Sequence, residues 1–264
     1  MIELAQFVLI GLGIGTFGSL VGLGGGLIMV PLFMLTMMPP NGGTFTTVQQ
    51  VVGTSLFGVL LNAISGSWAY VRQRRLMLRA AVPFALATIP GAFMGSFVSK
   101  WFTGPVFSIA FGTVLGLLGL FMYARSRRAK PSQTCEDFDP ETFYFPMGRG
   151  VGWSFVIGFL SSIFGIGGGV IHVPMMIIAL GFPAHVAVAT STFVLMISSV
   201  VGVIGHAWLD HIVWLPAVAV GGGAIVGAQI GAHLSKKSKP KVLMLILSLV
   251  MLCVGALLIW RGVA

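Results

Sequence analysis

Long stretches without charged side chains dominate this sequence. Asp, Glu, Lys and Arg are absent from six windows, 4–71, 80–99, 101–124, 150–209, 211–235 and 242–260. Each window approaches or exceeds the roughly 20 residues that a helix needs to cross a bilayer. Only 8% of the residues are charged and 56% are apolar, whereas a soluble domain carries about 25% charged residues. The chain is therefore expected to be an all-α polytopic membrane protein.

The net charge of +9 raises the question of a nucleic-acid partner. The basic residues, however, gather in short loops beside apolar spans, which is typical of loops that face the cytoplasm. We therefore expect the lipid bilayer as a partner and no nucleic acid. Cys135 lies in a hydrophilic segment and Cys253 in an apolar one, so the two cysteines predict neither a disulfide framework nor a metal site.

The chain contains nearly the same motif twice. Residues 22–31 read Gly-Leu-Gly-Gly-Gly-Leu-Ile-Met-Val-Pro, and residues 165–174 read Gly-Ile-Gly-Gly-Gly-Val-Ile-His-Val-Pro. The segments 54–100 and 190–236 also align without a gap. A glycine-broken apolar segment in each half of a membrane protein is the usual sequence sign of a transporter.

The duplication divides the chain into three parts. We expect a first membrane repeat at 1–123 and a second at 150–264. The segment 124–149 between them is too short and too polar to build a core, and we expect a cytoplasmic linker there.

Basic residues occupy opposite joins in the two repeats. Four arginines lie in 72–79, where the second repeat has Asp210 and His211. Four lysines lie in 236–241, where the first repeat has Lys100 alone. The positive-inside rule places both basic joins in the cytoplasm, so equivalent loops fall on opposite sides. The sequence therefore predicts two inverted-topology repeats, a common transporter plan.

The two glycine-broken segments are expected to form helical hairpins. As one helix, residues 4–38 would extend over ~50 Å, against a hydrocarbon core of ~30 Å. The charge pattern also requires residues 150–182 to begin and end on the same side of the membrane. Each repeat is then a glycine-broken hairpin plus three transmembrane helices, and both termini lie outside. The sequence predicts 8–10 spans in all, because it does not decide between two short crossings and a re-entrant loop.

The glycine clusters are the first candidates for a binding site. Glycine allows positive φ and close approach of a ligand, and a helix that restarts after a break directs free N–H groups at an anion. Broken backbone inside a bilayer must also be buried or line a cavity. The alternative is close helix packing, which we expect of the Gly-x-x-x-Gly pairs at 91–95 and 227–231. The candidate glycines are Gly24, Gly25, Gly26, Gly167, Gly168 and Gly169.

Polar side chains recur at equivalent positions after the two breaks. Such groups can donate hydrogen bonds to a small oxyanion, or they can bond to their own helix or a neighbouring one. These further candidates for substrate binding are Thr54, Ser55 and Asn62 in the first repeat and Thr190, Ser191 and Ser198 in the second.

Two histidines lie within the apolar segments. His172 follows the second glycine cluster, where the first repeat has Met29, and His206 aligns with Tyr70. Intramembrane ionisable residues often carry protons, so both are candidates for coupling transport to a proton. The alternative is a neutral histidine hydrogen-bonded between helices. The other three histidines are expected near the membrane interface: His185, His211 and His233.

Sequence patterns of enzymes are missing. The chain has no G-x-S-x-G, no H-E-x-x-H and no P-loop lysine motif. Its acids lie outside the apolar windows, which excludes intramembrane proteolysis by paired aspartates. Five scattered histidines without acids or paired cysteines do not form a metal site. We therefore expect no enzyme activity, no cofactor and no bound metal.

The doubled G-x-G-G-G-x-x-x-V-P, the Thr-Ser pair after each copy and the Gly-Ala-x-x-Gly helix ending in Ser-Lys resemble the TauE/SafE family. This is the sulfite exporter-like or 4-toluene sulfonate uptake permease group, and the resemblance covers residues 5–260. It implies a secondary carrier of the inner membrane for sulfite, thiosulfate or a small organosulfonate. Family members both export and take up their substrates, so the resemblance leaves the direction open.

The main hypothesis is therefore a secondary transporter of a small sulfur-containing anion, with alternating access between the two repeats. A proton or another ion is a possible coupling partner. Two alternatives remain: an integral-membrane scaffold or assembly protein without a transport cycle, and a passive anion channel. The sequence predicts no particular oligomeric state.

Overall fold

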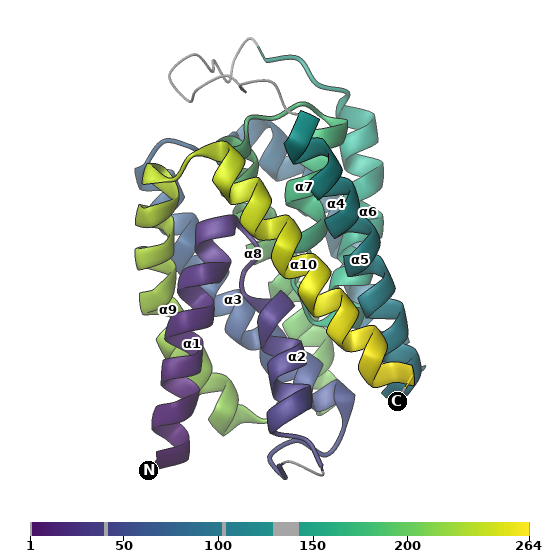
Figure 1. Ribbon diagram of the computed structural model, residues 1–264. Coiled ribbons are helices and arrows are strands. Elements are labelled where there is room, and N and C mark those ends of the chain that lie inside the picture. The colour runs from purple at the N-terminus through teal and green to yellow at the C-terminus, as the bar shows by residue number, and fades with distance from the viewer. Residues whose placement is uncertain (1, 40–41, 102–103, 129–142, 264) are drawn as a thin grey trace.

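The computed structural model describes residues 2–39, 42–101, 104–128 and 143–263. These residues form ten α-helices and a short 3-10 helix and contain no strand, which confirms the predicted all-α class (Figure 1). Eight helices are long and apolar enough to cross a membrane. The helices are α1 (Ile2–Val21), α2 (Gly26–Thr36), α3 (Val48–Arg72), α4 (Leu78–Val98), η1 (Ser99–Trp101), α5 (Gly104–Arg128), α6 (Met147–Phe164), α7 (Gly169–Ala179), α8 (Ala184–Trp208), α9 (Trp214–Lys237) and α10 (Pro240–Val263).

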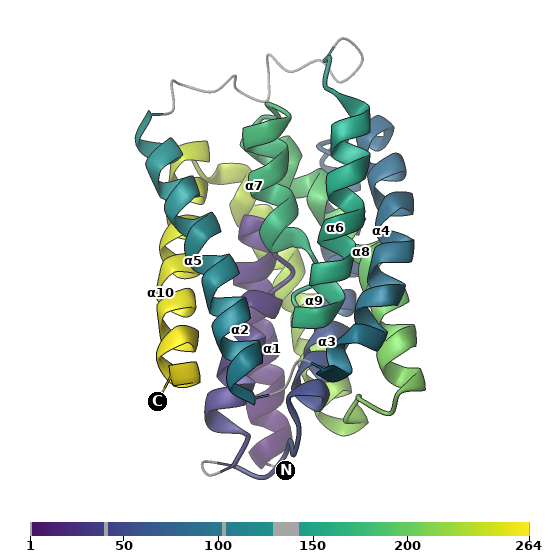
Figure 2. The ribbon, with the colours of Figure 1, turned by 90° about the vertical axis from the view of Figure 1, so that its right-hand side faces the viewer.

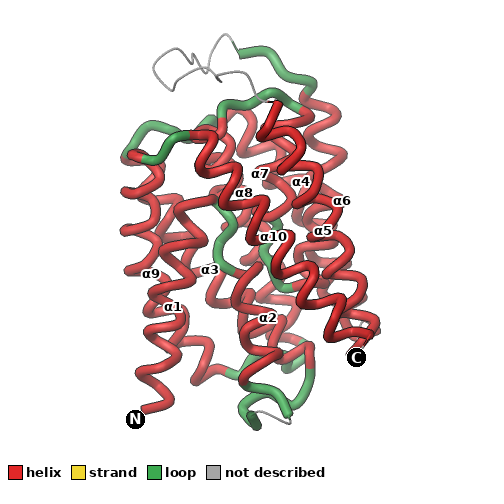
Figure 3. The backbone as a smooth tube through the Cα atoms, in the orientation of Figure 1, coloured by secondary structure: helices red, strands yellow, loops and turns green. Residues whose placement is uncertain are grey.

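Each glycine-broken segment forms a hairpin of one long helix and one short helix. α1 and α6 contain 20 and 18 residues, and α2 and α7 contain 11 each. Eleven residues give about 16 Å of helix, roughly half the thickness of the hydrocarbon core. The hairpin of α1 and α2 opens toward the end where the N-terminus is marked, and that of α6 and α7 opens toward the opposite end (Figure 1). Figure 3 shows both connecting loops in the interior of the bundle.

The long helices pack in pairs around these hairpins. α1 lies along α9, and α4 lies along α6. α5 and α10 form a third pair at one side of the bundle (Figure 2). α3 and α8 contact each other, and each also contacts the short helix of a hairpin, α2 and α7 respectively.

Small residues allow two of these helix pairs to approach closely. Gly91 and Gly95 of α4 lie against the backbone carbonyl groups of Phe155 and Phe159 in α6. The pair at 227–231 in α9 lies against the backbone of α1 in the same way. Close packing through small residues replaces the hydrophobic driving force that water would provide. The prediction that these glycines serve helix packing is confirmed.

The basic joins lie together at one end of the molecule. The α3–α4 join and the α9–α10 join lie at the end where the chain leaves α5 and enters α6, while both termini lie at the opposite end (Figure 1). Most of the predicted linker, residues 129–142, lies outside the described residues, so the three-part division of the chain stays a prediction. Cys135 and the linker acids also lie there.

This arrangement predicts the membrane topology. In a variant with Cys135 and Cys253 replaced by serine, we expect a cysteine at position 3 to react with a membrane-impermeant maleimide added to intact cells. A cysteine at position 236 should react only after the cells are permeabilised, because the positive-inside rule places the lysine-rich join in the cytoplasm. Labelling of position 236 in intact cells would contradict the predicted orientation.

Candidate functional site

The two glycine breaks contact each other in the middle of the bundle. A Cβ atom on Gly26 would lie only 2.8 Å from the carbonyl oxygen of Gly165 and 2.7 Å from the Cα of Ile166. A Cβ atom on Gly169 would likewise lie too close to the carbonyl oxygen of Gly22. Two segments far apart in the sequence therefore form one central structure, visible as the inner loops of Figure 3.

The breaks need glycine because of their backbone conformation. Gly24 and Gly25 have φ angles of 69° and 88°, and Gly167 and Gly168 have φ angles of 71° and 81°. Side chains of L-residues disfavour this left-handed region, whereas glycine enters it freely. The repeated motif thus encodes the same local backbone twice.

Two helices begin at this centre. The N–H of Met29 bonds to the carbonyl of Gly25 at 3.0 Å, and the N–H of His172 bonds to the carbonyl of Gly168 at 2.9 Å. The N–H groups of Ile28 and Ile171 bond to the same two carbonyls. The N–H groups at 26–27 and 169–170, in the first turns of α2 and α7, have no intrahelical acceptor. Leu27 and Val170 in these turns are fully buried. Two buried helix N-termini directed at one region favour a negative charge there.

Apolar side chains fill the space beside the breaks. A Cβ on Gly24 would lie 2.5 Å from Leu195 Cδ2 and 2.9 Å from Val59 Cγ1. Gly167 lies against the same two side chains. Val59 and Leu195 are fully buried and pack together with Ala63. The breaks are therefore closed off by one large side chain from each half of the chain.

Thr54 and Thr190 hold the starts of two helices. The Thr54 hydroxyl accepts a hydrogen bond from the N–H of Val213 at 3.0 Å, just before α9. The Thr190 hydroxyl accepts one from the N–H of Met77 at 3.2 Å, just before α4. Each threonine thus joins α3 or α8 to a helix of the other half. Their role in binding a substrate stays a prediction.

Asn62 is also held by several partners. Its amide nitrogen donates to the carbonyls of Gly15 at 2.9 Å and Ala224 at 3.3 Å, and its oxygen accepts from the Ser19 hydroxyl at 3.0 Å. Asn62 therefore ties α3 to α1 and α9. The hydroxyl of Ser198, its counterpart, is buried and has no hydrogen-bond partner among the described residues.

Several other buried hydroxyls lack a partner within the described ranges. Ser55 and Ser191, both predicted site residues, belong to this group. So do Ser161 and Ser199, which the sequence analysis did not single out. Ser199 Oγ would lie 3.1 Å from a Cβ on Gly167, and Ser161 Oγ 3.4 Å from a Cβ on Gly168. Ser161 could have been chosen as a candidate from the sequence, because it lies in the last helical turn before the second glycine cluster.

The two candidate histidines have different surroundings. His172 Nε2 lies 3.1 Å from the hydroxyl of Ser154, which itself donates to the carbonyl of Gly150 at 2.7 Å. His172 Nδ1 is buried without a partner among the described residues. His206 Nε2 lies 3.0 Å from the carbonyl of Ser162, and His206 Nδ1 lies 3.2 Å from Nδ1 of His211. No group of three potential metal ligands occurs within the described residues.

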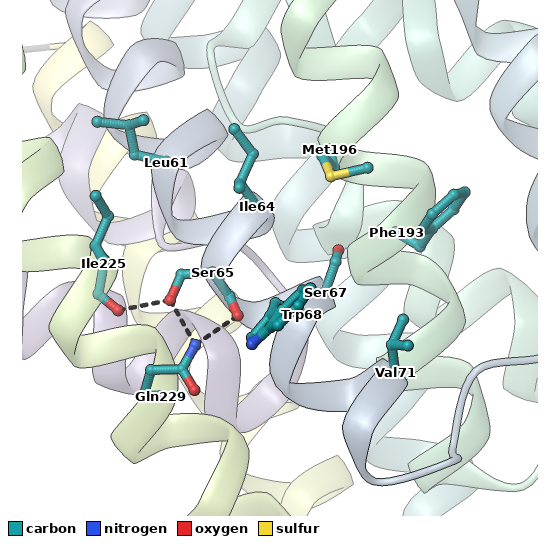
Figure 4. Close-up of a pocket in the computed structure, with 10 residues that line it drawn as sticks. All are labelled: Leu61, Ile64, Ser65, Ser67, Trp68, Val71, Phe193, Met196, Ile225 and Gln229. Carbon is teal, nitrogen blue, oxygen red and sulfur yellow. Dashed lines mark hydrogen bonds between the residues drawn. The ribbon is translucent and has the colours of Figure 1, made fainter.

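A separate groove of about 570 Å³ runs between α3, α8 and α9 (Figure 4). Apolar side chains such as Trp68 and Met196 line it. Two of its polar members, Ser65 and Gln229, bond to each other at 2.7 Å across α3 and α9. None of the predicted site residues lines this groove, so it is distinct from the central breaks.

Comparison with known proteins identifies relatives of the whole chain. A family model described as "Sulfite exporter TauE/SafE" matches residues 7–258. A probable membrane transporter protein of Bacillus subtilis, YunE, is 34% identical, with 97% of each chain covered. A probable membrane transporter protein of Xylella fastidiosa is 27% identical over 96% of this chain and 92% of its own length. No solved structure matches the chain.

Substitution of a break glycine tests how tightly the centre is packed. We expect Gly24→Ala to destabilise the protein by about 2–5 kcal/mol, from about 1–2 for a left-handed non-glycine backbone and about 1–3 for overpacking against Leu195. Leu195→Ala in the same chain should recover part of this loss, because it removes the nearest atoms. Thermal unfolding in detergent of the two single variants and the double variant measures this coupling.

Gly222→Ala is the matched control, since a Cβ at this position in α9 would meet nothing within 4 Å. It should leave stability unchanged or raise it slightly, as expected for alanine in a helix interior. Equal effects of Gly24→Ala and Gly222→Ala, or strict additivity with Leu195→Ala, would show that the centre is loosely packed.

Proposed function

The chain belongs to the sulfite exporter TauE/SafE family of membrane transporters, and we propose that it is a secondary carrier of a small sulfur-containing anion. Sulfite, thiosulfate and small organosulfonates are the proposed substrates. The observation that carries this proposal is the meeting of two buried helix N-termini, α2 and α7, at the centre of the bundle. The sequence has no P-loop lysine motif, so we assign the driving force to an ion gradient or to the gradient of the substrate itself.

The proposed anion site lies between the first turns of α2 and α7. Backbone N–H groups there supply hydrogen bonds without a permanent positive charge, which suits a ligand that must be released again. The hydroxyls of Ser161 and Ser199 lie beside Gly168 and Gly167 and add two donors. We retain Ser55, Ser191 and Ser198 as further candidates, because their buried hydroxyls have no partner among the described residues.

Val59 and Leu195 form the proposed gate of this site. Both side chains press against Gly24 and Gly167 in the present conformation. An anion can reach the free N–H groups only when these side chains move away. Because Val59 lies in α3 and Leu195 in α8, a relative movement of the two halves would open the gate.

We propose that the two halves are inverted-topology repeats that rock against each other about this centre. Several contacts support this proposal because they occur in equivalent pairs. Gly22 lies against Val188 of α8, and Gly165 lies against Val52 of α3. The reciprocal bonds of Thr54 and Thr190 follow the same pattern. Alternating access by such movement is the usual mechanism of transporters built in this way.

Transport by the purified protein in liposomes tests the proposed function. We expect saturable uptake of labelled sulfite or an alkanesulfonate, accelerated when the same anion is loaded inside the vesicles. This counterflow requires a carrier that returns with bound substrate. Flux without counterflow would indicate a passive channel, and absence of flux over a broad panel of anions would support a scaffold protein.

The unpartnered hydroxyls allow a test of the site itself. We expect Ser199→Ala to weaken substrate affinity about tenfold or more, because a hydrogen bond to a charged group contributes about 1.5–3 kcal/mol. It should not lower thermal stability, since the Ser199 hydroxyl has no partner to lose in this structure. Affinity is measured from the concentration dependence of counterflow.

Thr190→Val is the matched comparison for a hydroxyl that holds the fold. It leaves the N–H of Met77 without its acceptor and should cost about 1–3 kcal/mol of stability. If Ser199→Ala transports with unchanged affinity, the proposed position of the anion beside Gly167 is wrong.

A further inference from the structure

His206 and His211 form a hydrogen-bonded pair at the end of the bundle that carries the chain termini. Their Nδ1 atoms lie 3.2 Å apart, and His206 Nε2 lies 3.0 Å from the carbonyl oxygen of Ser162. His206 belongs to the last turns of α8 and is fully buried. His211 lies in the α8–α9 join and is partly exposed. We call these two residues the outer histidine pair.

The neighbours of the pair determine where its hydrogens lie. A carbonyl oxygen only accepts, so His206 Nε2 carries a hydrogen and donates it to Ser162. In neutral His206 the Nδ1 atom is then a bare acceptor. His211 must donate its Nδ1–H to that atom, which leaves the lone pair on His211 Nε2. His211, the more exposed histidine of the pair, therefore carries the nitrogen that is free to bind a proton.

We propose that the outer histidine pair is the entry and binding site of the coupling proton, an assignment that rests on the proposed carrier function. A proton from water on the outer side binds His211 Nε2. The Nδ1–H hydrogen of His211 then passes to His206 Nδ1 as a proton, and the electron pair of that N–H bond stays on His211. His211 ends neutral with its hydrogen on Nε2, and His206 ends as an imidazolium that still donates to Ser162.

The short contact limits the pair to one proton. A second proton would give both Nδ1 atoms a hydrogen, and two N–H groups cannot face each other at 3.2 Å without breaking the contact. A single proton keeps the hydrogen bond and makes it charge-assisted, which strengthens it. The geometry therefore favours a shared titration with a stoichiometry of one.

The charged surroundings of the pair are sparse. Asp210 adjoins His211, and Lys100 follows α4 at the same end. Partial burial lowers the pKa of His211 from its ordinary value, and the Asp210 carboxylate raises it. The elements packed against the pair are α3, α4, α6 and the start of α9, and their segments 48–71, 80–99, 150–209 and 211–235 contain no Asp, Glu, Lys or Arg. The arginines of these helices, Arg72, Arg79 and Arg149, lie at the opposite end of α3, α4 and α6.

The first half carries a different pair at the equivalent position. Tyr70 aligns with His206, and its hydroxyl donates to the carbonyl of Ser19, as His206 donates to that of Ser162. Arg75 aligns with His211 and places its guanidinium 5.3 Å from the centre of the Tyr70 ring. At the end of the molecule that carries the basic joins, the permanently charged Arg75 thus takes the position that the titratable His211 has at the opposite end. Proton uptake through this device is therefore confined to the outer side.

The accepting carbonyl connects the pair to the anion site. Ser162 lies in the last turn of α6, three residues before the break at Gly165. An imidazolium on His206 places a positive charge beside this hairpin, in a bundle whose interior otherwise lacks formal charge. Proton and anion should then strengthen each other's binding by the same factor, because thermodynamic coupling is reciprocal.

The first test measures proton binding without any anion. In protein labelled with ¹³C-histidine in detergent micelles, we expect the Cε1 signals of His206 and His211 to move together. Their common midpoint should lie below the ordinary histidine value of about 6.5, because partial burial lowers the pKa of His211. In His206→Tyr, the remaining His211 signal should shift its midpoint by at least about half a pH unit, because its hydrogen-bond partner is changed. Independent titration of the two signals, or a midpoint of His211 that His206→Tyr does not alter, would overturn the proposal.

The second test measures coupling in liposomes with an alkanesulfonate, whose charge is constant over this pH range. Apparent affinity should rise at least about fivefold as the outside pH falls from 8 to 6. The double variant His206→Tyr/His211→Arg carries the residues of the first half and should fold, yet its affinity should vary less than about twofold. His233→Gln, an exposed histidine at the other end, is the control and should keep the pH dependence.

The two tests distinguish a failure of the proposed proton site from a failure of the proposed carrier function. If no anion is transported, the carrier function is wrong, while the titration still decides whether the pair binds one proton. If the double variant keeps the full pH dependence, or if His172→Gln abolishes it, the coupling proton does not bind at the outer histidine pair.

Discussion

The structure depends on one constraint: backbone N–H and C=O groups inside a bilayer must be satisfied by the protein, because lipid provides no hydrogen bonds. A helix broken in mid-membrane is therefore tolerated only when it is enclosed. Here each break is enclosed by the other and by α3 and α8, with Gly26 against the backbone of Gly165 and Gly169 against the backbone of Gly22. The long helix pairs α1–α9 and α4–α6 complete the enclosure, and their small residues bring backbones close together.

The same enclosure explains why we place the proposed binding site at the closed centre. The first N–H groups of a helix have no intrahelical acceptor, and burying such donors costs free energy unless another group accepts from them. The apolar side chains of Val59 and Leu195, which pack against Gly24 and Gly167, offer no acceptor. In the proposed mechanism an anion takes the place of these side chains and accepts from the donors, which would link binding to movement of the two halves.

Much of the fold was predictable because its signals are local. Charge-free windows fixed the membrane class, and positive φ at Gly25 and Gly168 agrees with the glycine clusters that predicted the hairpins. The roles of single polar groups were not predictable, since they depend on partners far along the chain. The Thr54 hydroxyl accepts a hydrogen bond from the N–H of Val213, and the Asn62 amide donates one to the carbonyl of Ala224. Ser199 approaches Gly167 only because α8 packs on the second hairpin.

Distance measurement between spin labels tests the proposed rocking of the two halves most directly. One label pair, at Arg74 and Lys239, reports on the basic end, and another, at Thr44 and Leu215, reports on the outer end. In proteoliposomes, saturating transported anion should change the two distances in opposite directions, as alternating access about a central site requires. Unchanged distances at both ends with a transported anion bound would contradict this account.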